Sequence, residues 1–390
     1  MKKIISTVLI GATTSLMAMY SEQAYLYKDN RIMGAGGANT SVGGYSTSIF
    51  YNPAGLRDIK KEHGFVVDLL GLQIDGSEKF KDFVDDLTDA MDTEEDETAA
   101  LVEVAQKYNG EHYHANISNY SAISKNSDIF AWSVGLLVGA DINYMTHSDG
   151  SSNGSSLETT SRGYGGIFLG IAKDFKTDFG KFDVGVSGKF IQQKSYEGNI
   201  PIDELATSDD LMTYLEDNYE QKSSGFGIDV GVIYHPVPKN YWRPAIGLSL
   251  LNIGDMSMDD YYGTQPMTLN VGASVSPQIS FLSKFVIAAD LVDILNANDA
   301  TYYDYNNKKI TVSNEDFEKK IRAGITAGLI DSSWFSLELS GGFYQSSYTA
   351  GLNMEATILK ISAATYEENI GYGSVDIKDR RYSLQLGIGW

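Results

Sequence analysis

Alternation of apolar and polar residues along extended runs constrains the fold of this chain more than any other feature. In RRYSLQLGIGW (380–390), apolar side chains occupy every second position and therefore one face of a strand. GFGIDVGVIY (225–234) and FAWSVGLLVGADI (130–142) repeat the pattern. Runs of about 9–13 residues are long enough to cross a bilayer at a tilt and exceed the usual soluble strand. The sequence therefore predicts an all-β, membrane-spanning antiparallel barrel rather than a soluble sandwich.

About fourteen such runs can be counted, an even number of the kind that bacterial barrels require. We expect the strands to begin near His63, Glu111, Asp128, Leu157, Phe179, Ser223, Trp242, Met267, Lys284, Lys320, Trp334, Ser347, Thr357 and Arg380. Short and long connections alternate, as in barrels with short turns on one side and long outer loops on the other. The connection at Gln345-Ser346 is short where a long one is due. The long connections span 74–110, 144–156, 197–222, 252–266, 294–319 and 369–379.

Two of the long connections have helical periodicity, which predicts helical insertions at 77–108 and 202–219. The first insertion gathers Phe80, Phe83, Val84, Leu87 and Met91 on one face. The second does the same with Leu205, Leu211, Leu215 and Tyr219. Such faces either cap the barrel by packing on its rim or form an apolar groove that collects a hydrophobic ligand.

The first residues have the features of an export signal. Met1-Lys2-Lys3 is a short basic region, and the stretch 4–19 is apolar over a length typical of signal peptides. We expect a signal peptide over 1–24, cleaved between 18 and 24. The alternative is a membrane-anchoring helix, for which the run is short. No later stretch reaches about 18 uninterrupted apolar residues, so no transmembrane helix is expected.

A glycine-rich segment, GAGGANTSVGGYSTSIFYNPAGL (34–56), follows the expected signal. It lacks the Gly-Lys-Ser/Thr ending of a phosphate-binding loop, and no apolar strand precedes it in the mature chain. Glycine does, however, let the backbone pack closely against a crowded wall. Pro53 presets a turn, and Asn52 can hydrogen-bond nearby backbone groups. The segment therefore suits a plug inside the barrel, with a flexible linker as the alternative.

Composition removes several classes of function. The chain has no cysteine, which excludes disulfides, thiolate metal sites and cysteine nucleophiles. Asp and Glu number 51 against 30 Lys and Arg, so the chain repels nucleic acid. His112 and His114 share a strand face and would allow adventitious metal binding, but no further ligand stands at a recognisable spacing. We therefore expect no enzyme, no cofactor, no resident metal and no nucleic-acid partner.

Charged residues inside the alternating runs indicate the polar face of the barrel. A charge facing lipid at mid-depth costs about 2–4 kcal/mol, so the register has little freedom. These residues either pair with one another and the plug or line a polar path for a solute. The residues expected to face the lumen are Asp183, Lys189, Asp229, Arg322, Glu338, Glu355 and Lys360.

The glycine-rich segment and its Asn52-Pro53-Ala54 resemble the N-terminal segment of FadL/TodX-type outer-membrane barrels. Six later segments are similar to a related group, labelled TraF-type conjugal-transfer proteins, that shares its architecture with PorV. The resemblance covers nearly the whole mature chain. The segments are IGLSLLNIGD, MTLNVGASVSP, IAADLVDIL, IRAGITAGLI, YTAGLNMEATILKISAATYEENIG and DRRYSLQLGIGW.

The resemblance implies a plug at 25–62, a transmembrane barrel at 63–390 and a place in the bacterial outer membrane. FadL-type barrels pass hydrophobic molecules such as long-chain fatty acids. The plug would be fixed by Gly34, Gly36, Gly37, Asn52, Pro53, Ala54 and Gly55. The implied partners are outer-membrane lipid, a small hydrophobic ligand and the barrel-assembly machinery. That machinery would read a last strand that carries Tyr382, Leu386 and Trp390.

Two functions follow as hypotheses. The first is passive uptake of small hydrophobic molecules. The alternative is a structural or docking component of a conjugation or secretion apparatus. A lateral gap or an apolar pocket in the lumen favours uptake, whereas a sealed lumen with a protruding surface favours docking.

Overall fold

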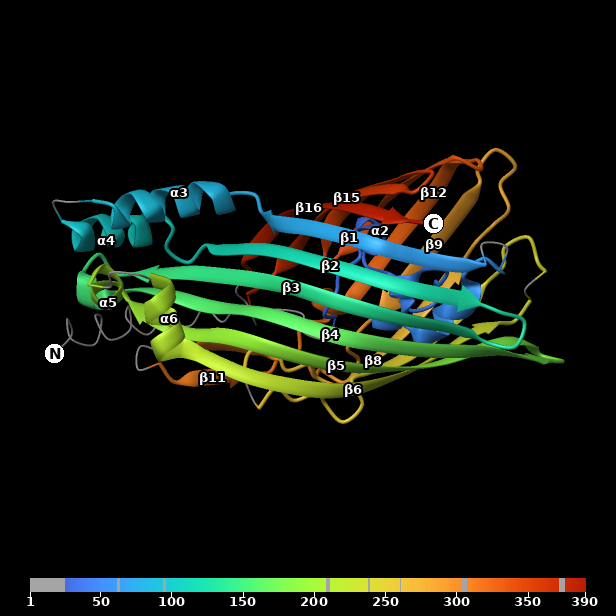
Figure 1. Ribbon diagram of the computed structural model, residues 1–390, viewed down its shortest axis with the longest axis horizontal. Helices are drawn as coiled ribbons and strands as arrows, with labels where there is room; N and C mark the ends of the chain where they lie inside the picture. The colour runs from blue at the N-terminus through green and yellow to red at the C-terminus, as the bar shows by residue number, and fades with distance from the viewer. Residues whose placement is uncertain are drawn as a thin grey trace.

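The computed structural model describes residues 25–61, 64–93, 96–207, 211–237, 239–259, 261–303, 307–371 and 376–390. The expected signal peptide at 1–24 lies outside them. Fourteen strands close into one antiparallel barrel (Figure 1), which confirms the predicted fold. The strands are β1 Phe65–Ser77, β2 His112–Asn126, β3 Ala131–Ser148, β4 Ser155–Thr177, β5 Gly180–Pro201, β6 Glu220–His235, β7 Ala245–Leu251, β8 Thr268–Val275, β9 Lys284–Leu291, β12 Ile321–Asp331, β13 Phe335–Tyr344, β14 Ser347–Ala356, β15 Leu359–Asn369 and β16 Lys378–Gly389.

The barrel closes where β1 pairs with β16. Their register runs from Asp68 opposite Gly389 to Ser77 opposite Arg381. Backbone bonds between Val67 and Trp390, 2.7 and 2.9 Å long, extend the closure by one further pair. Closure matters because an unpaired strand edge in lipid leaves backbone groups without partners, at several kcal/mol each.

Side chains alternate across the wall as the sequence predicts. On β16 the apolar residues Tyr382, Leu384, Leu386 and Ile388 are exposed on the outer face, while Ser383 between them is buried inside. The same alternation runs along β3, β6 and most of the other strands. An apolar exterior around a polar interior is the arrangement of a barrel in a membrane. None of the helices among the residues described could cross a bilayer, because each is too short or too polar.

The wall is much taller on one side than on the other. Strands β4 and β5 pair from Ser156–Pro201 to Thr177–Gly180, whereas β8 and β9 pair only over 271–275 and 287–291. In Figure 1 the long strands β2–β6 project well beyond β12–β16, toward the end that carries the helices. Chain outside the sheet must therefore cover the low side of the wall.

Both predicted helical insertions form, and they cap the projecting strands. The first contains α3 (Phe80–Met91) and α4 (Glu97–Lys107), and the second contains α5 (Ile202–Ala206) and α6 (Leu211–Tyr219). Phe83 is fully buried and stacks on Tyr113 of β2, with ring centres 4.4 Å apart. Leu205 and Leu215 belong to the same buried cluster. The apolar faces are thus consumed in packing, which is the cap interpretation rather than the open groove.

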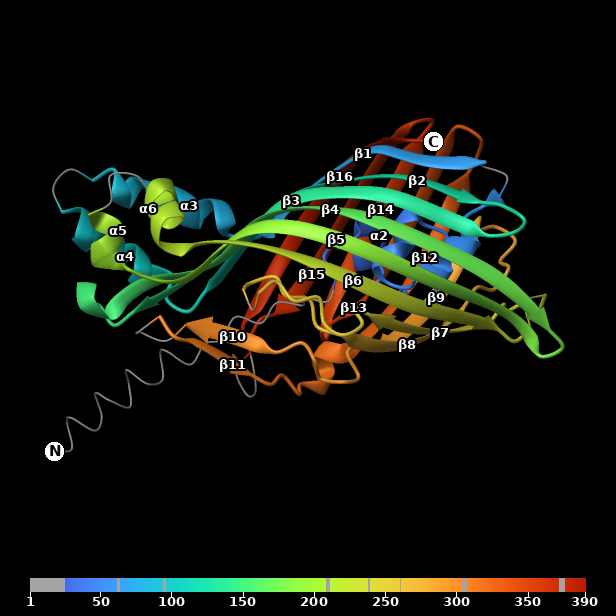
Figure 2. The same cartoon turned by 60° about the horizontal axis from the view of Figure 1, so that its bottom comes forward.

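Two features of the connections depart from simple loops. The stretch 294–319 contains an unpredicted hairpin of β10 (Ala300–Tyr303) and β11 (Lys309–Val312), drawn in Figure 2 beside the long strands. A short helix, η5 (Phe317–Lys320), follows it, and another, η4 (Ser152–Gly154), lies between β3 and β4. The short connection predicted at Gln345-Ser346 is confirmed. Both of its residues have positive φ, 49° and 64°, as a tight hairpin turn requires.

The segment before β1 lies inside the barrel. It contains α2 (Asn30–Gly34), η1 (Ser46–Phe50) and η2 (Pro53–Asp58), seen in blue within the strands in Figures 1 and 2. Most of its side chains are buried, and it contacts strands on opposite sides of the wall. We call residues 25–59 the plug.

Candidate functional site

The glycine run of the plug packs directly on the backbone of β12–β14. The amide of Gly36 donates to Thr349 Oγ1 at 3.0 Å, and the Thr349 hydroxyl donates to the carbonyl of Gly34 at 2.9 Å. Gly36 has φ +71°, and a Cβ there would overlap the carbonyl oxygen of Ala323. Gly37 also has positive φ, +73°. Glycine is therefore required here by both conformation and space.

A wall carboxylate receives the next turn of the plug. Asp290 of β9 is buried, and its Oδ2 accepts from the amides of Asn39 and Thr40, each at 2.7 Å. Two hydrogen bonds to one ionised oxygen form a strong tether. The plug is held at this point to the low side of the wall.

Asn52-Pro53-Ala54 forms the junction between the plug and β6–β7. The Asn52 side chain accepts from the amide of Ala54 at 3.0 Å and caps η2. Its amide nitrogen donates to the carbonyl of Thr40 at 2.6 Å, and to the carbonyls of Val232 and Leu248 at 3.3 Å each. A Cβ at Gly231 would overlap Asn52 Oδ1, so the wall leaves room for this side chain.

The remaining predicted plug residues lie within the same buried core. Pro53, Ala54 and Gly55 are all buried, and Ala54 packs with Ile233 and Ala245 of the wall. The Gly55 carbonyl accepts from the amide of Gly44 at 2.9 Å. The seven predicted plug residues therefore all lie where the plug folds on itself or meets the wall.

Replacing Asn52 with leucine should loosen the plug. Leucine cannot supply the amide donors or the cap, and each buried group left unsatisfied costs about 1–3 kcal/mol. Hydrogen exchange of the plug amides should therefore accelerate by at least about tenfold, since about 1.4 kcal/mol is a factor of ten. Asn52→Asp keeps the cap acceptor but turns a buried carboxylate oxygen toward three carbonyl oxygens, so it should loosen the plug at least as much as leucine does. Equal exchange in all three proteins would contradict this role.

The beginning of the plug is organised by a buried ion pair. Asp29 is fully buried, and its Oδ2 contacts Arg31 Nη2 at 2.6 Å and Thr47 Oγ1 at 2.5 Å. Burial opposes the ionised form, but the guanidinium and its hydrogen bonds outweigh it and lower the pKa of Asp29. The pair holds α2 against η1.

Two further cations tether the plug at either end. Lys28 pairs with the buried Glu368 of β15. Arg57, at the other end, pairs with Asp174 of β4 and donates to Asn126 Oδ1 at 2.6 Å. Contacts at both ends and along the middle immobilise the plug as part of the interior.

All seven charged residues expected in the lumen lie on the inner face of the wall. Four are buried and three are half-buried beside the plug. The buried ones are Asp183, Lys189, Asp229 and Arg322, and the half-buried ones are Glu338, Glu355 and Lys360.

Several of these charges pair within the wall. Lys189 Nζ lies 3.0 Å from Asp229 Oδ1, and Lys284 Nζ lies 3.2 Å from Glu338 Oε1. Arg322 lies over the ring of Tyr344 of β13. Burial of a charge in this interior is sustained by such partners.

Other charges join the wall to the plug. Lys284 Nζ also lies 2.7 Å from the hydroxyl of Tyr45. Lys360 Nζ lies 2.7 Å from Asp68 Oδ1, and Asp68 Oδ2 accepts from Ser46 Oγ at 2.5 Å. Pairing therefore accounts for much of the polar lining.

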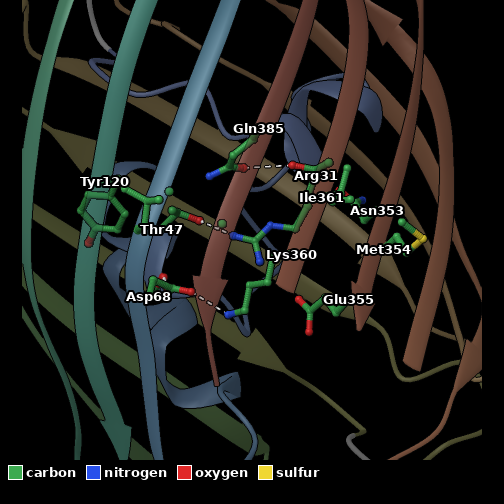
Figure 3. A pocket seen from close by; sticks show the side chains of 15 residues that line it. Arg31, Thr47, Asp68, Tyr120, Asn353, Met354, Glu355, Lys360, Ile361 and Gln385 are labelled. Atoms are coloured by element: carbon green, nitrogen blue, oxygen red, sulfur yellow. Dashed lines mark hydrogen bonds and ion pairs between the residues drawn. The ribbon is translucent and has the colours of Figure 1, made fainter. Parts of the chain in front are cut away.

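Three cavities that adjoin the plug are small. One of about 40 Å³ lies between the plug and β1, β14, β15 and β16, and is lined by Arg31, Asp68, Glu355, Lys360 and Gln385 (Figure 3). Two others measure about 50 and 20 Å³. Volumes of this size hold a few water molecules, whereas benzene occupies engineered cavities of about 150 Å³. A hydrocarbon does not fit in these cavities as they stand.

The half of the lumen nearer the helical cap contains a charged network. His112 Nδ1 lies 3.2 Å from Asp379 Oδ2, and His114 Nε2 lies 3.0 Å from Asp75 Oδ1. Arg381 contacts Asp379 at 2.7 Å. The two histidines considered as metal ligands thus each face a carboxylate on a different strand.

The connection expected as an outer loop at 252–266 folds inward instead, and it extends to residue 267 because β8 begins at Thr268. Met256 and Met258 are fully buried in a cluster that includes plug residues such as Phe50. The Tyr262 hydroxyl donates to Asp141 Oδ1 of β3 at 3.1 Å. We call residues 252–267, of which Asp260 is not among the described residues, the inner loop.

Several residues that organise the interior escaped prediction. Asp290 sits in IAADLVDIL at an inward position, and the rule that selected Asp229 would have selected it too. Arg57 and Met256 gave no such signal, because their importance depends on which surfaces meet in space.

Comparison with known proteins agrees with this architecture. A family model described as "F plasmid transfer operon, TraF, protein" matches residues 49–341. No match is found among curated proteins. The solved "TodX monoaromatic hydrocarbon channel deltaS2 mutant" is 11% identical, with a TM-score of 0.54 over 95% of this chain and 99% of that one. The Ralstonia pickettii toluene transporter TbuX is 12% identical, with a TM-score of 0.54 over 94% and 98%.

The Pseudomonas putida toluene transporter TodX has a TM-score of 0.50 at 10% identity, over 96% of this chain and 98% of that one. Identities this low establish the shared barrel fold and leave ligand and activity open. The match to the TraF family model covers most of the chain, and it is stronger evidence of common ancestry than the structural matches are. The protein therefore belongs to the TraF family named above, and its fold is that of the FadL/TodX-type outer-membrane barrels.

Proposed function

We propose that this protein is an outer-membrane channel for small hydrophobic molecules, closed at rest by the plug and the inner loop. The observation that carries the proposal is a gap in the hydrogen-bonded wall. β6 pairs with β7 only over 230–234, so the stretch 220–229 has no β7 partner. A barrel that only needed to be sealed would gain from continuous pairing here.

The gap lies beside apolar surface and is closed by the inner loop. Phe226 and Ile228 of β6 and Ile253 of the loop are exposed on the outside. The Ile253 amide donates to the carbonyl of Ile228 at 2.8 Å, and Met256 and Met258 pack behind it. Movement of this loop would connect the apolar exterior with the apolar cluster around the plug.

Similarity of fold supports the same function. The solved structures with this barrel include channels and transporters for monoaromatic hydrocarbons and toluene. The small cavities mean that passage requires movement of the inner loop, the plug or both. Location in the outer membrane follows from the same proposal and from the apolar outer face.

A disulfide that locks the inner loop tests the proposal. A Cβ at Gly225 would lie 2.9 Å from Met256 Cγ, the position that a cysteine sulfur would take. In a disulfide with an S–S bond of about 2.05 Å, the Cβ of one cysteine lies about 3 Å from the sulfur of the other. The distance at Gly225 and Met256 is close to this value. The chain has no native cysteine, so the pair Gly225→Cys with Met256→Cys would form without competition. The oxidised variant should lose uptake of radiolabelled toluene into cells, and reduction should restore it.

The single variants Gly225→Cys and Met256→Cys are the matched controls, and both should transport in either redox state. Uptake that persists in the oxidised double variant would exclude the inner loop as the gate. Absence of uptake of toluene and of longer alkanes by the reduced protein, in comparison with a deletion strain, would overturn the channel function itself.

The docking alternative rests on a different observation. The cap formed by α3–α6 projects far beyond the low side of the wall (Figure 1), and the three cavities described beside the plug are too small for a hydrocarbon. The alternative is a structural role in a conjugation or secretion apparatus. It predicts that deletion of residues 80–107 abolishes assembly of such an apparatus while uptake stays normal.

A further inference from the structure

Three potential metal ligands meet where the plug touches the wall, at the end of the barrel with the short turns. Asp58 ends η2 of the plug, Asp183 lies near the beginning of β5, and His235 ends β6. Each offers one ligand atom, and these atoms all lie within 4.8 Å of one another. Two ligands that bind one ion at about 2.0–2.2 Å lie roughly 3–4 Å apart, so small side-chain adjustments would suffice.

The most buried of the three has unused ligand capacity. Asp183 is fully buried, and its Oδ1 has no hydrogen-bond partner among the residues that the structure describes. Buried carboxylate oxygens usually have a hydrogen-bond partner, so this oxygen, which lies beside two other ligand atoms, has the capacity to bind a cation. Its Oδ2 lies 2.9 Å from His235 Nε2 and 2.7 Å from Lys181 Nζ.

Lys181 currently supplies positive charge to the cluster. Its ammonium also lies 3.8 Å from Asp58 Oδ1, and its side chain is one quarter exposed, at 25%. A long, flexible lysine at an exposed edge can swing into water. The ammonium is therefore a replaceable counter-ion for two carboxylates.

We propose that Asp58, Asp183 and His235 bind one divalent transition-metal ion, with Zn²⁺ the best fit. One imidazole nitrogen with two carboxylate oxygens is a ligand set that suits zinc, and water would complete the coordination. Because one ligand comes from the plug and two come from the wall, the ion joins the plug to β5 and β6. Binding would stabilise the closed state of the lumen at this end.

Metal binding by the full-length protein tests the proposal. Protein purified in detergent and stripped with EDTA is titrated with Zn²⁺, Mn²⁺ or Mg²⁺ and its metal content is measured after dialysis. The wild type should retain one Zn²⁺ per chain. His235→Ala and Asp58→Asn should each weaken Zn²⁺ binding by at least about tenfold, since even outer-shell changes cost about 10–100-fold. Lys181→Met should strengthen binding, because it removes the competing ammonium.

His147→Ala is the matched control. His147 lies on β3 near the cap, and its Nε2 is 2.8 Å from the carboxylate of Glu158 on β4. It should leave Zn²⁺ binding unchanged. A second readout is tryptic cleavage after Arg57, which Zn²⁺ should slow in the wild type but not in His235→Ala. No retained Zn²⁺, or equal loss in His147→Ala and His235→Ala, would overturn the site. A folding defect would weaken Zn²⁺ binding, whereas Lys181→Met should strengthen it. Misfolding therefore cannot explain the expected result for this variant.

Discussion

Replacing Gly36 with valine is expected to displace the plug and make the barrel permeable to small hydrophilic solutes. Gly36 has φ +71°, where a β-branched residue costs about 1–3 kcal/mol. The added Cβ would also overlap the carbonyl oxygen of Ala323, and overpacking costs about 1–3 kcal/mol more. The population with a displaced plug should therefore rise by at least about tenfold. Liposome swelling with small sugars measures the leak.

Gly188→Val is the control for this prediction. Gly188 lies on β5, and a Cβ there would meet no atom within 4 Å. The variant should assemble and remain as impermeable as the wild type. If Gly36→Val is equally impermeable while running as a folded barrel on gels, the plug does not seal the lumen at this glycine.

Replacing Leu386 with arginine should nearly abolish assembly of the barrel. Leu386 is exposed on the outer face of β16, between Leu72 of β1 and Ile361 of β15. Aromatic residues at Tyr382 and Trp390 bracket it, as interfacial girdles do, so it lies near the middle of the apolar band. An arginine there costs about 2–4 kcal/mol. The fraction that shows heat-modifiable migration on gels should fall accordingly, while export to the periplasm continues.

Two control variants distinguish the effect of a charge deep in the membrane from the effect of any substitution on β16. Tyr382→Arg changes the same face nearer the strand end, where a charge costs only about 0–1 kcal/mol, and should assemble far better. Leu386→Val keeps the apolar surface and should assemble normally. Equal assembly of Leu386→Arg and Leu386→Val would mean that this face of β16 does not contact lipid.

The strands were predictable because their signal is local. Alternation needs only neighbouring residues, and lipid outside with protein inside fixes which set faces which way. The predicted strand positions near Asp128, Lys284 and Ser347 lie within three residues of the observed starts of β3, β9 and β14. The two helical insertions followed from periodicity in the same way.

The connections were less predictable because their conformation depends on what they contact. The inner loop has the polar, irregular composition of an outer loop, yet it turns inward because the low wall of β7–β9 leaves a space that Met256 and Met258 fill. The β10–β11 hairpin packs on the long strands through Tyr303, whose amide donates to Glu158 at 3.2 Å. Neither surface exists until the barrel has closed.

The sequence by itself determined that this chain forms a lipid-facing barrel with charged residues inside, and that a glycine-rich segment near the N-terminus suits a crowded interior. These properties follow from side-chain period, glycine content and the cost of charge in lipid, which act over a few residues. Only the tertiary structure decided how the lumen is closed. Asp290 meets Asn39 across 251 positions of sequence, and Asp58 meets Asp183 and His235 where the plug ends. Such pairings depend on strand tilt and wall height, which arise from closure of the whole sheet.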